Sequence, residues 1–288
     1  MAKTRHLAKH KYSKKRNMKQ KPLVLAIETS SRIGSAAIAL GGKILAESDF
    51  SAPIRHSAEI FPAIGGLLDR FSRKPDQIKQ IHISVGPGSF TGLRIAVTLA
   101  KVMHLANAAK IVAVDTLDVI AANATDYIKE ENTNITSHSE PSLRHTKRSE
   151  VEDPLRRKSP ERIATILDAK RGLFFIAVFE LNTNDKRRAT SDGIWKKVFS
   201  DSLMTTSQFL DKFVRDKQPI WLLGDGLQYY KDKFKADGTQ FLDQKYWRPR
   251  ASKVHLLAWK KALANQFADP LKLTPNYLLR PDIKIKQR

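Results

Sequence analysis

The order of short apolar runs in this 288-residue sequence constrains its fold more than any other feature. Three strand-like runs, at residues 23–30, 35–40 and 43–48, follow one another with only tight turns between them. From there, segments with helical spacing alternate with further strand-like runs. The first half therefore predicts a three-stranded antiparallel meander followed by alternating helices and strands, which is typical of an α/β fold.

The helices of this first half are expected at residues 57–72, 91–107 and 117–128, and the strands between them at 80–86 and 110–116. The first helix carries a single apolar stripe at helical spacing. The second is apolar on most faces and keeps only one narrow polar stripe. We therefore expect the second helix to be covered on more than one face.

Two glycines, Gly65 and Gly66, lie in the middle of the first predicted helix. Each weakens a helix interior by about 1 kcal/mol relative to alanine. A helix that keeps them could allow close approach of a neighbour, and a frayed helix is the alternative.

The polar segment 129–161 interrupts the alternation, because it has no periodicity and mixes both charge signs. It is typical of a disordered insertion or linker. Beyond it, runs at 162–169 and 173–181 predict a hairpin, and strands again alternate with helices. The second half is a shorter version of the first, so we expect one lobe at residues 22–128 and a second at 162–288.

The formal net charge of +22 is concentrated at the two ends of the chain. Residues 1–21 hold nine lysines or arginines and no acid, and residues 245–288 hold eleven against Asp269 and Asp282. Basic arms attract phosphate backbones, so nucleic acid is the expected partner class and a solubilising tail the alternative. A start at Met18 would make most of the first, disordered arm a dispensable extension. A transit peptide fits less well, because the arm contains little serine.

The sequence contains no cysteine, which excludes disulfides, thiolate metal sites and a cysteine nucleophile. Its apolar runs fall short of the roughly 18 residues that cross a bilayer, and no signal-peptide pattern follows the basic arm. We therefore expect a soluble, cytoplasmic protein.

The glycine-rich segment SVGPGSFTGLR, at residues 84–94, lies between a predicted strand and a predicted helix. Backbone N–H groups at such a helix start favour an anion. However, the lysine of a P-loop is absent, and the glycine spacing is one residue too long for a dinucleotide fingerprint. An anion loop and a structural turn both remain open. The segment does not form a G-x-S-x-G motif either, so a serine nucleophile is not expected. The candidate loop residues are Gly86, Pro87, Gly88, Ser89, Thr91 and Gly92.

Two acids, Glu28 and Asp168, end the strands that open the two halves. If both face a cleft between two lobes, they could hold a hydrated magnesium ion or receive a proton. The alternative is that each caps a turn. No metal site is expected among the histidines, because the pair His6 and His10 lies in the basic arm outside any predicted fold.

Five segments are recognisable in this order: LAIETSSRIGSAAIAL, VGPGSFTGLRIAVTLAKVMHLA, ILDAKRGLFFIAVF, LLGDG and PNYLLR. Together they resemble the TsaB (YeaZ) family over residues 23–128 and 160–282. The resemblance implies two related α/β lobes of the actin, hexokinase and Hsp70 (ASKHA) type. It also implies a non-catalytic subunit of the complex that transfers threonylcarbamoyl to N6 of adenosine 37 in tRNAs that read ANN codons.

The same resemblance implies a TsaD-like catalytic subunit and a TsaE-like ATPase as partners, tRNA bound through the complex, and a homodimer when the partner is absent. No cofactor is expected to bind this chain tightly, although ATP or ADP with magnesium could bind at the complex interface. The catalytic relative carries a metal-binding histidine pair that the folded part of this sequence lacks, which disfavours a metallopeptidase of the glycoprotease type. An independent ATPase or small-molecule kinase of the same fold is the alternative.

In the family that the sequence resembles, the first two helices of the N-terminal lobe form the partner surface. Here these are the helices expected at 57–72 and 91–107. The interface residues implied are Ile60, Phe61, Ile64, Leu67, Leu68, Arg94, Val97, Thr98, Lys101 and Leu105.

Overall fold

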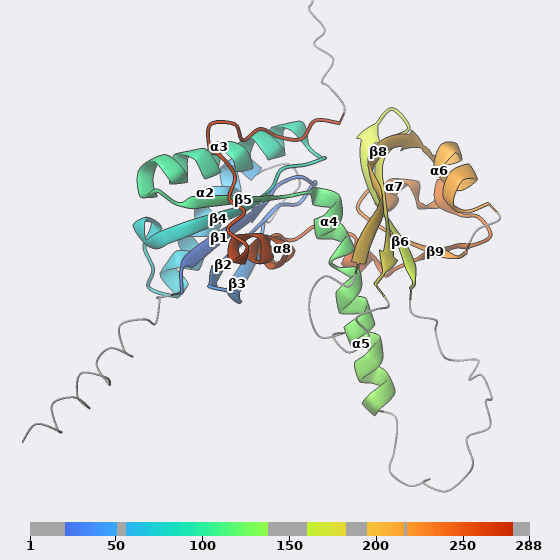
Figure 1. The fold of residues 1–288 in the computed structure, drawn as a ribbon, viewed down its shortest axis with the longest axis horizontal. Coiled ribbons are helices and arrows are strands. Elements are labelled where there is room, and N and C mark those ends of the chain that lie inside the picture. The colour runs from blue at the N-terminus through green and yellow to red at the C-terminus, as the bar shows by residue number, and fades with distance from the viewer. Residues whose placement is uncertain (1–20, 51–55, 138–159, 183–194, 216–217, 279–288) are drawn as a thin grey trace, which may run out of the picture.

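The computed structural model describes residues 21–50, 56–137, 160–182, 195–215 and 218–278. In it the chain forms two lobes, each built on a five-stranded mixed sheet (Figure 1). The expected basic arm, apart from its last residue, lies outside the described residues.

The first sheet has the strand order β3-β2-β1-β4-β5. Strands β1 (Leu23–Glu28), β2 (Ser35–Leu40) and β3 (Lys43–Asp49) form the predicted antiparallel meander. Strands β4 (Ile78–Ser84) and β5 (Lys110–Val114) continue the sheet in parallel with β1. Parallel neighbours need a crossover connection, and the intervening helices supply it.

The second sheet repeats this topology with the order β10-β9-β6-β7-β8. Strands β6 (Arg162–Lys170), β7 (Leu173–Leu181) and β8 (Trp195–Thr205) form an antiparallel meander. Strands β9 (Ile220–Leu223) and β10 (Thr239–Phe241) run parallel to β6. Two lobes with the same strand order confirm the predicted ASKHA-type fold.

Helices cover both faces of the first sheet. Helices α2 (His56–Arg70) and α3 (Phe90–Asn107) pack on one face, and α8 (Ala251–Leu263) packs on the other (Figure 1). Side chains alternate along β1, so Leu25 joins the core under α2 and α3, whereas Ala26 joins the one under α8. The small side chains on the second face let α8 approach the sheet closely.

Two helices that follow the first sheet pack on the second one. Helices α4 (Thr116–Ala121) and α5 (Ala124–Ser137) lie against the second sheet, where Leu117 and Ile120 enter its core. Conversely, α8 follows the second sheet but packs on the first. The expected lobe boundaries, 22–128 and 162–288, are therefore wrong in this respect, because each sheet needs an apolar helix from the other part of the chain to cover it.

The expected helix at 117–128 is two helices, separated at Asn123. The Asn123 amide donates hydrogen bonds to the carbonyl oxygens of Tyr246 (2.9 Å) and Arg248 (2.8 Å), which fixes the break. The second helix continues to residue 137, so the polar segment expected from 129 is helical over its first nine positions. Residues 138–159 of this segment lie outside the described residues.

The first sheet also caps the start of α8, which has no side-chain cap of its own. The Ser35 hydroxyl oxygen accepts from the backbone N–H of Ala251 at 2.8 Å, and a Glu47 carboxylate oxygen accepts from that of Ser252 at 2.9 Å. An acid at a helix N-terminus also complements the helix dipole. These two bonds tie the returning helix to β2 and β3.

An aromatic cluster fills the second lobe, with Phe174, Phe209 and Phe234 fully buried and in edge contact. Helices α6 (Thr206–Phe213) and α7 (Leu227–Tyr230) contribute to it. Within the ranges described, no helix is both long and apolar enough to span a membrane.

Candidate functional site

The glycine-rich loop joins β4 to α3 and ends in a helix cap. The Ser89 hydroxyl oxygen accepts a hydrogen bond from the backbone N–H of Gly92 at 3.3 Å. Gly86 has a backbone φ of 121°, a conformation that favours glycine. The local sequence therefore turns the chain sharply from strand into helix.

Two of the loop glycines lie against the end of β1. A Cβ on Gly88 would lie 2.4 Å from the carbonyl oxygen of Ser30, and one on Gly92 would lie 1.8 Å from that of Thr29. Hydrogen bonds close the same contact: Ser89 N–H donates to the Ser30 carbonyl, and the Thr29 hydroxyl donates to the Gly92 carbonyl, both at 2.7 Å. Close packing against β1 accounts for both glycines without a bound anion.

The C-terminal segment, up to residue 278, secures the same loop. The Asn276 N–H donates to the Val85 carbonyl oxygen at 2.7 Å, and Arg94 Nε donates to the Tyr277 hydroxyl at 3.2 Å. The Arg94 guanidinium also stacks on Phe90, 3.8 Å from the ring centre. The start of α3 is thus held from two sides.

Half of the predicted interface residues face the lobe's own core. They are Ile60, Ile64, Leu67, Leu68 and Val97, all less than 9% exposed and all in the core cluster between the first sheet and its helices. The prediction that they form a contact surface is wrong for this conformation, because the apolar stripe of each helix covers the sheet beneath it.

The other predicted interface residues lie on the outer side of α2 and α3. Phe61 is 66% exposed and Leu105 is 82% exposed, while Arg94 and Thr98 are exposed and Lys101 is half-buried. These five residues have the accessibility that a contact surface needs.

Sequence reasoning missed one member of this outer surface, Val102, which is 52% exposed. It lies on α3 near Leu105. The signal that could have found it is an apolar side chain outside the main stripe of its helix. We refer to Phe61, Val102 and Leu105 as the outer apolar face.

The two mid-helix glycines border this face. Helix α2 is continuous from His56 to Arg70, so the alternative of a frayed helix is wrong. A Cβ on Gly65 or Gly66 would meet no other atom within 4 Å. Packing within the described chain therefore gives no reason for either glycine.

Three carboxyl groups interact where the turns of the two lobes face each other. Glu28 is fully buried, and burial raises the pKa of its carboxyl above the ordinary value. One of its oxygens accepts from the Ser30 N–H at 2.6 Å and from the Ser30 hydroxyl, and the other has no hydrogen-bond partner among the described residues. Asp168 accepts from the backbone N–H of Lys170 at 2.7 Å and from its ammonium at 2.6 Å.

The third carboxyl, Asp225, was not singled out by sequence reasoning, although it lies in the glycine-flanked turn after β9. Burial raises the pKa of Asp225 to about 7, and the negative charges of Asp168 and Glu28 add to this effect. The two predicted acids thus belong to one electrostatic cluster with Asp225. Their expected roles in magnesium binding or proton transfer stay predictions.

Arg32 links the lobes beside these acids. Its backbone N–H donates to Asp225, and its guanidinium lies 5.3 Å from the ring centre of Tyr229. The β1–β2 turn of one lobe therefore touches the β9–α7 region of the other. Among the residues described, no group of three or more histidine and acidic side chains could hold a metal ion.

Comparison with known proteins finds similar sequences that all belong to tRNA threonylcarbamoyladenosine biosynthesis. The sequence model of TsaD, described as tRNA N6-adenosine threonylcarbamoyltransferase, matches residues 50–134, the stretch that contains α2 and α3. The tRNA threonylcarbamoyladenosine biosynthesis protein TsaB of Bacillus subtilis is 25% identical over 91% of this chain and 96% of its own length. The protein of the same name in Escherichia coli is 22% identical over 88% and 95%.

Solved structures show the same fold. YeaZ from Pseudomonas aeruginosa superposes with a TM-score of 0.65 at 19% identity, over 89% of this chain and all of its own. A second Pseudomonas aeruginosa structure, described as similar to peptidase YeaZ, has a TM-score of 0.66 at 19% identity, over 90% of this chain and all of its own. The resemblance seen in the sequence motifs is therefore confirmed.

Proposed function

We propose that this chain, a member of the TsaB (YeaZ) family, acts in tRNA threonylcarbamoyladenosine biosynthesis as a non-catalytic partner subunit. In this role it pairs with a TsaD-like catalytic subunit, which transfers threonylcarbamoyl to N6 of adenosine 37. The chain supports that reaction by contact and does not perform it.

The observation that carries the proposal is the outer apolar face on α2 and α3. Its three side chains, Phe61, Val102 and Leu105, are more than half exposed on neighbouring helices. Large apolar side chains that stay exposed on neighbouring helices favour a protein interaction site. Gly65 and Gly66 leave room beside them for a partner helix to approach closely.

A TsaD-like lobe is the occupant that fits this face best. The part of the chain that matches the TsaD sequence model includes both helices, so the two proteins would share a related lobe. Related lobes can meet through equivalent helix pairs, and two copies of this chain can do the same. We therefore expect a homodimer in isolation that gives way to the heterodimer.

The remaining assignments follow from this role. A TsaE-like ATPase would join the assembly, and tRNA would bind through the complex in the cytoplasm. ATP or ADP with magnesium would bind at the complex interface. No comparison favours an independent ATPase or small-molecule kinase.

Light scattering after size exclusion tests the pairing. Wild-type protein mixed with the TsaD-like subunit of the same organism should elute as a one-to-one heterodimer. Leu105→Glu should leave two separate species, because the charge would be buried in the contact. Leu263→Glu is the matched control, since Leu263 is 66% exposed on α8, across the sheet from α2 and α3. Undiminished pairing of Leu105→Glu would refute the proposed surface.

A further inference from the structure

The exposed side chain of Arg94 is held in place by contacts that do not neutralise its charge. It lies near the start of α3, where its guanidinium is 3.8 Å from the centre of the Phe90 ring. Its Nε atom donates to the Tyr277 hydroxyl at 3.2 Å. A ring contact and a hydrogen bond together fix the plane of a guanidinium, so this arginine is more ordered than an ordinary surface cation.

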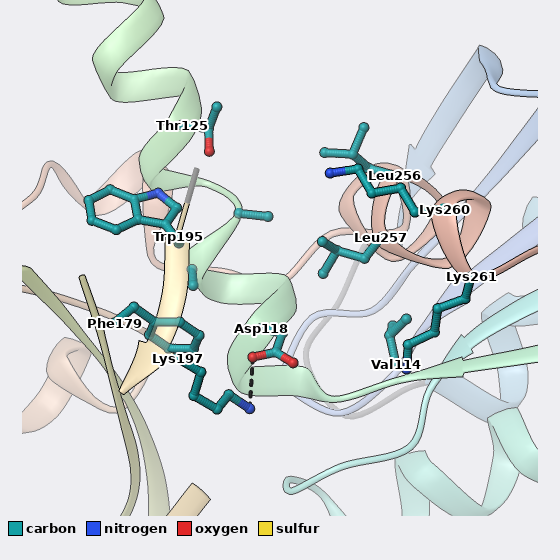
Figure 2. A pocket seen from close by; sticks show the side chains of 12 residues that line it. Val114, Asp118, Thr125, Phe179, Trp195, Lys197, Leu256, Leu257, Lys260 and Lys261 are labelled. Carbon is teal, nitrogen blue, oxygen red and sulfur yellow. Dashed lines mark ion pairs between the residues drawn. The ribbon is translucent and has the colours of Figure 1, made fainter. Parts of the chain in front are cut away.

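Arg94 forms no ion pair with any residue that the structure describes. Other ordered cations of the chain have acidic partners. In the cavity between the lobes, the Lys197 ammonium lies 2.7 Å from a carboxylate oxygen of Asp118 (Figure 2), and the Arg250 guanidinium lies 2.8 Å from one of Asp126. Arg94 has a ring and a hydroxyl in place of an acid.

The outer edge of the Arg94 guanidinium is available to a further partner. The bond to Tyr277 uses Nε, so both terminal amino groups still have N–H donors to offer. Their fork geometry matches the two oxygens of a carboxylate or phosphate group. Because the group is already held in one orientation, binding an anion there costs little further side-chain entropy.

Arg94 belongs to the same side of α3 as the outer apolar face. It shares a line of exposed side chains, spaced three or four residues apart, with Thr98, Val102 and Leu105. The helix rise puts Arg94 about 17 Å from Leu105 along α3. A standard interface of about 800 Å² on each partner extends this far. A subunit that covers Val102 and Leu105 therefore covers Arg94 as well.

Covering Arg94 makes an acceptor on the partner necessary. A guanidinium removed from water without a partner of opposite charge is strongly unfavourable. The described part of this chain supplies no such partner, so the covering subunit has to supply it. A carboxylate is the protein group that binds both terminal amino groups at once.

We propose that Arg94 is a preformed receptor for a carboxylate of the TsaD-like subunit, with Phe90 and Tyr277 as positioning residues. The inference rests on the proposed function, because it places the carboxylate on the subunit that covers the outer apolar face. A tRNA phosphate has similar geometry, but nucleic-acid interfaces are more polar than a surface that includes Val102 and Leu105.

Isothermal titration of the full-length chain with the TsaD-like subunit tests the receptor. Arg94→Met should weaken pairing at least tenfold and flatten its dependence on salt. Arg94→Lys should weaken pairing severalfold, because lysine keeps the charge and loses the fork. The control Arg215→Met should change nothing, since Arg215 is 73% exposed in the second lobe and pairs with Asp211. Wild-type affinity of Arg94→Met would overturn the proposal.

A double-mutant cycle tests the positioning role of Tyr277. Tyr277→Phe keeps the ring and the Arg94 charge and should weaken pairing severalfold. In the Arg94→Met background the same change should have no effect, because no guanidinium is left to position. An equal loss in both backgrounds would show that Tyr277 acts on pairing independently of Arg94, and would refute the positioning role.

A charge exchange identifies the carboxylate. Arg94→Glu should abolish pairing while the circular dichroism spectrum stays that of wild type. The exposed acids on the equivalent helices of the TsaD-like subunit are then changed to lysine one at a time, and one of these changes should restore pairing with Arg94→Glu. Failure of every such change to restore pairing would overturn the proposal.

The same measurements separate this inference from the proposed function. If the wild-type chain and the TsaD-like subunit do not pair at all, the proposed function fails. If wild type pairs, Leu105→Glu does not, and Arg94→Met pairs like wild type, only the receptor fails. Filter binding of tRNA to the heterodimer covers the other anion. Weakened tRNA binding with unchanged pairing in Arg94→Met would assign Arg94 to a phosphate and overturn the carboxylate.

Discussion

Arg94 and Tyr277 lie 183 positions apart in the sequence and are joined by a hydrogen bond of 3.2 Å from Arg94 Nε to the tyrosine hydroxyl. The bond connects the C-terminal segment to the first turn of α3. The tyrosine ring also contacts Phe90, with ring centres 5.0 Å apart. A chain end thus fixes the start of a helix that carries the outer apolar face.

Two substitutions at Tyr277 separate the bond from the ring contact. Tyr277→Phe keeps the ring on Phe90 and loses only the hydroxyl, so we expect a loss of about 0.5–1 kcal/mol in the free energy of unfolding. Tyr277→Ala loses both contacts and should cost more. Urea titrations of both variants measure this order, and equal stability of the two would show that the ring contact contributes nothing.

Two glycine substitutions should change stability in opposite directions. Gly92→Ala forces a Cβ to within 1.8 Å of the Thr29 carbonyl oxygen, so we expect a loss of about 3 kcal/mol or more. Gly66→Ala places its Cβ in open space within a helix and should gain about 0.5–1 kcal/mol. Thermal unfolding checks both values. A tolerated Gly92→Ala would contradict the close packing of the loop on β1.

A glutamate introduced on α3 should unfold the protein at a core position and leave it folded at a surface position. Val97 is 6% exposed in the core, so Val97→Glu buries a charge and should unfold the first lobe. Leu105→Glu should retain the wild-type circular dichroism spectrum, because its side chain is 82% exposed. A folded Val97→Glu protein would mean that α3 faces the other way.

A buried histidine pair between β4 and α8 should make the protein acid-sensitive. Nδ1 of His82 lies 3.2 Å from Nδ1 of His255. Burial lowers the pKa of His82 to about 3, with a contribution from His255, and burial lowers that of His255 to about 4. Below pH 6.5 the unfolded chain binds protons that the folded chain does not. The stability from the neutral pair is therefore complete above pH 6.5 and is lost as pH falls toward 3–4.

Each histidine should lower the free energy of unfolding at pH 5 by about 2 kcal/mol relative to pH 7.5. His255→Leu should reduce the difference in the free energy of unfolding between these two pH values by about that amount. Urea titrations of wild type and variant at both values measure it. If the free energy of unfolding changed equally with pH in wild type and in His255→Leu, the lowered pKa of His255 in the folded chain would be contradicted.

Asp225 should contribute to pH dependence with the opposite sign. The pKa of Asp225 is raised to about 7, mainly by burial, so its stabilising contribution is complete below pH 3.8 and is lost as pH rises through about 7. Asn cannot ionise, and its side-chain oxygen can still accept from the Arg32 N–H. The free energy of unfolding of Asp225→Asn, measured relative to wild type, should therefore rise by about 2 kcal/mol between pH 5 and pH 8. A pH-independent effect would contradict the raised pKa.

The sequence predicted the three strands of the first meander and the hairpin that opens the second, because short apolar runs bounded by turn residues are a local signal. It did not predict which side of α2 and α3 would face outward. A helical stripe shows that Ile60 and Val97 are buried, but burial under a partner and burial on the chain's own sheet leave the same pattern. The outer residues Phe61 and Leu105 differ only by lying off that stripe.

The crossing of α4 and α8 between the lobes could not be read from local patterns either. An amphipathic helix shows that one face is covered, and it does not identify the covering sheet. The bonds that decide the arrangement, from Asn123 to Tyr246 and from Ala251 to Ser35, join residues more than 120 positions apart. The sequence did not predict a role for Asp225 for the same reason, since its pKa depends on burial and on acids from distant turns.

The content of threonylcarbamoyladenosine in tRNA tests the central claim most directly. In a strain depleted of the chromosomal copy, mass analysis of tRNA nucleosides should show loss of this nucleoside. Plasmid-borne wild type and Leu263→Glu should restore it, and Leu105→Glu should not. Wild-type levels in the depleted strain, or full restoration by Leu105→Glu, would contradict the claim that this chain acts in the pathway through its outer apolar face.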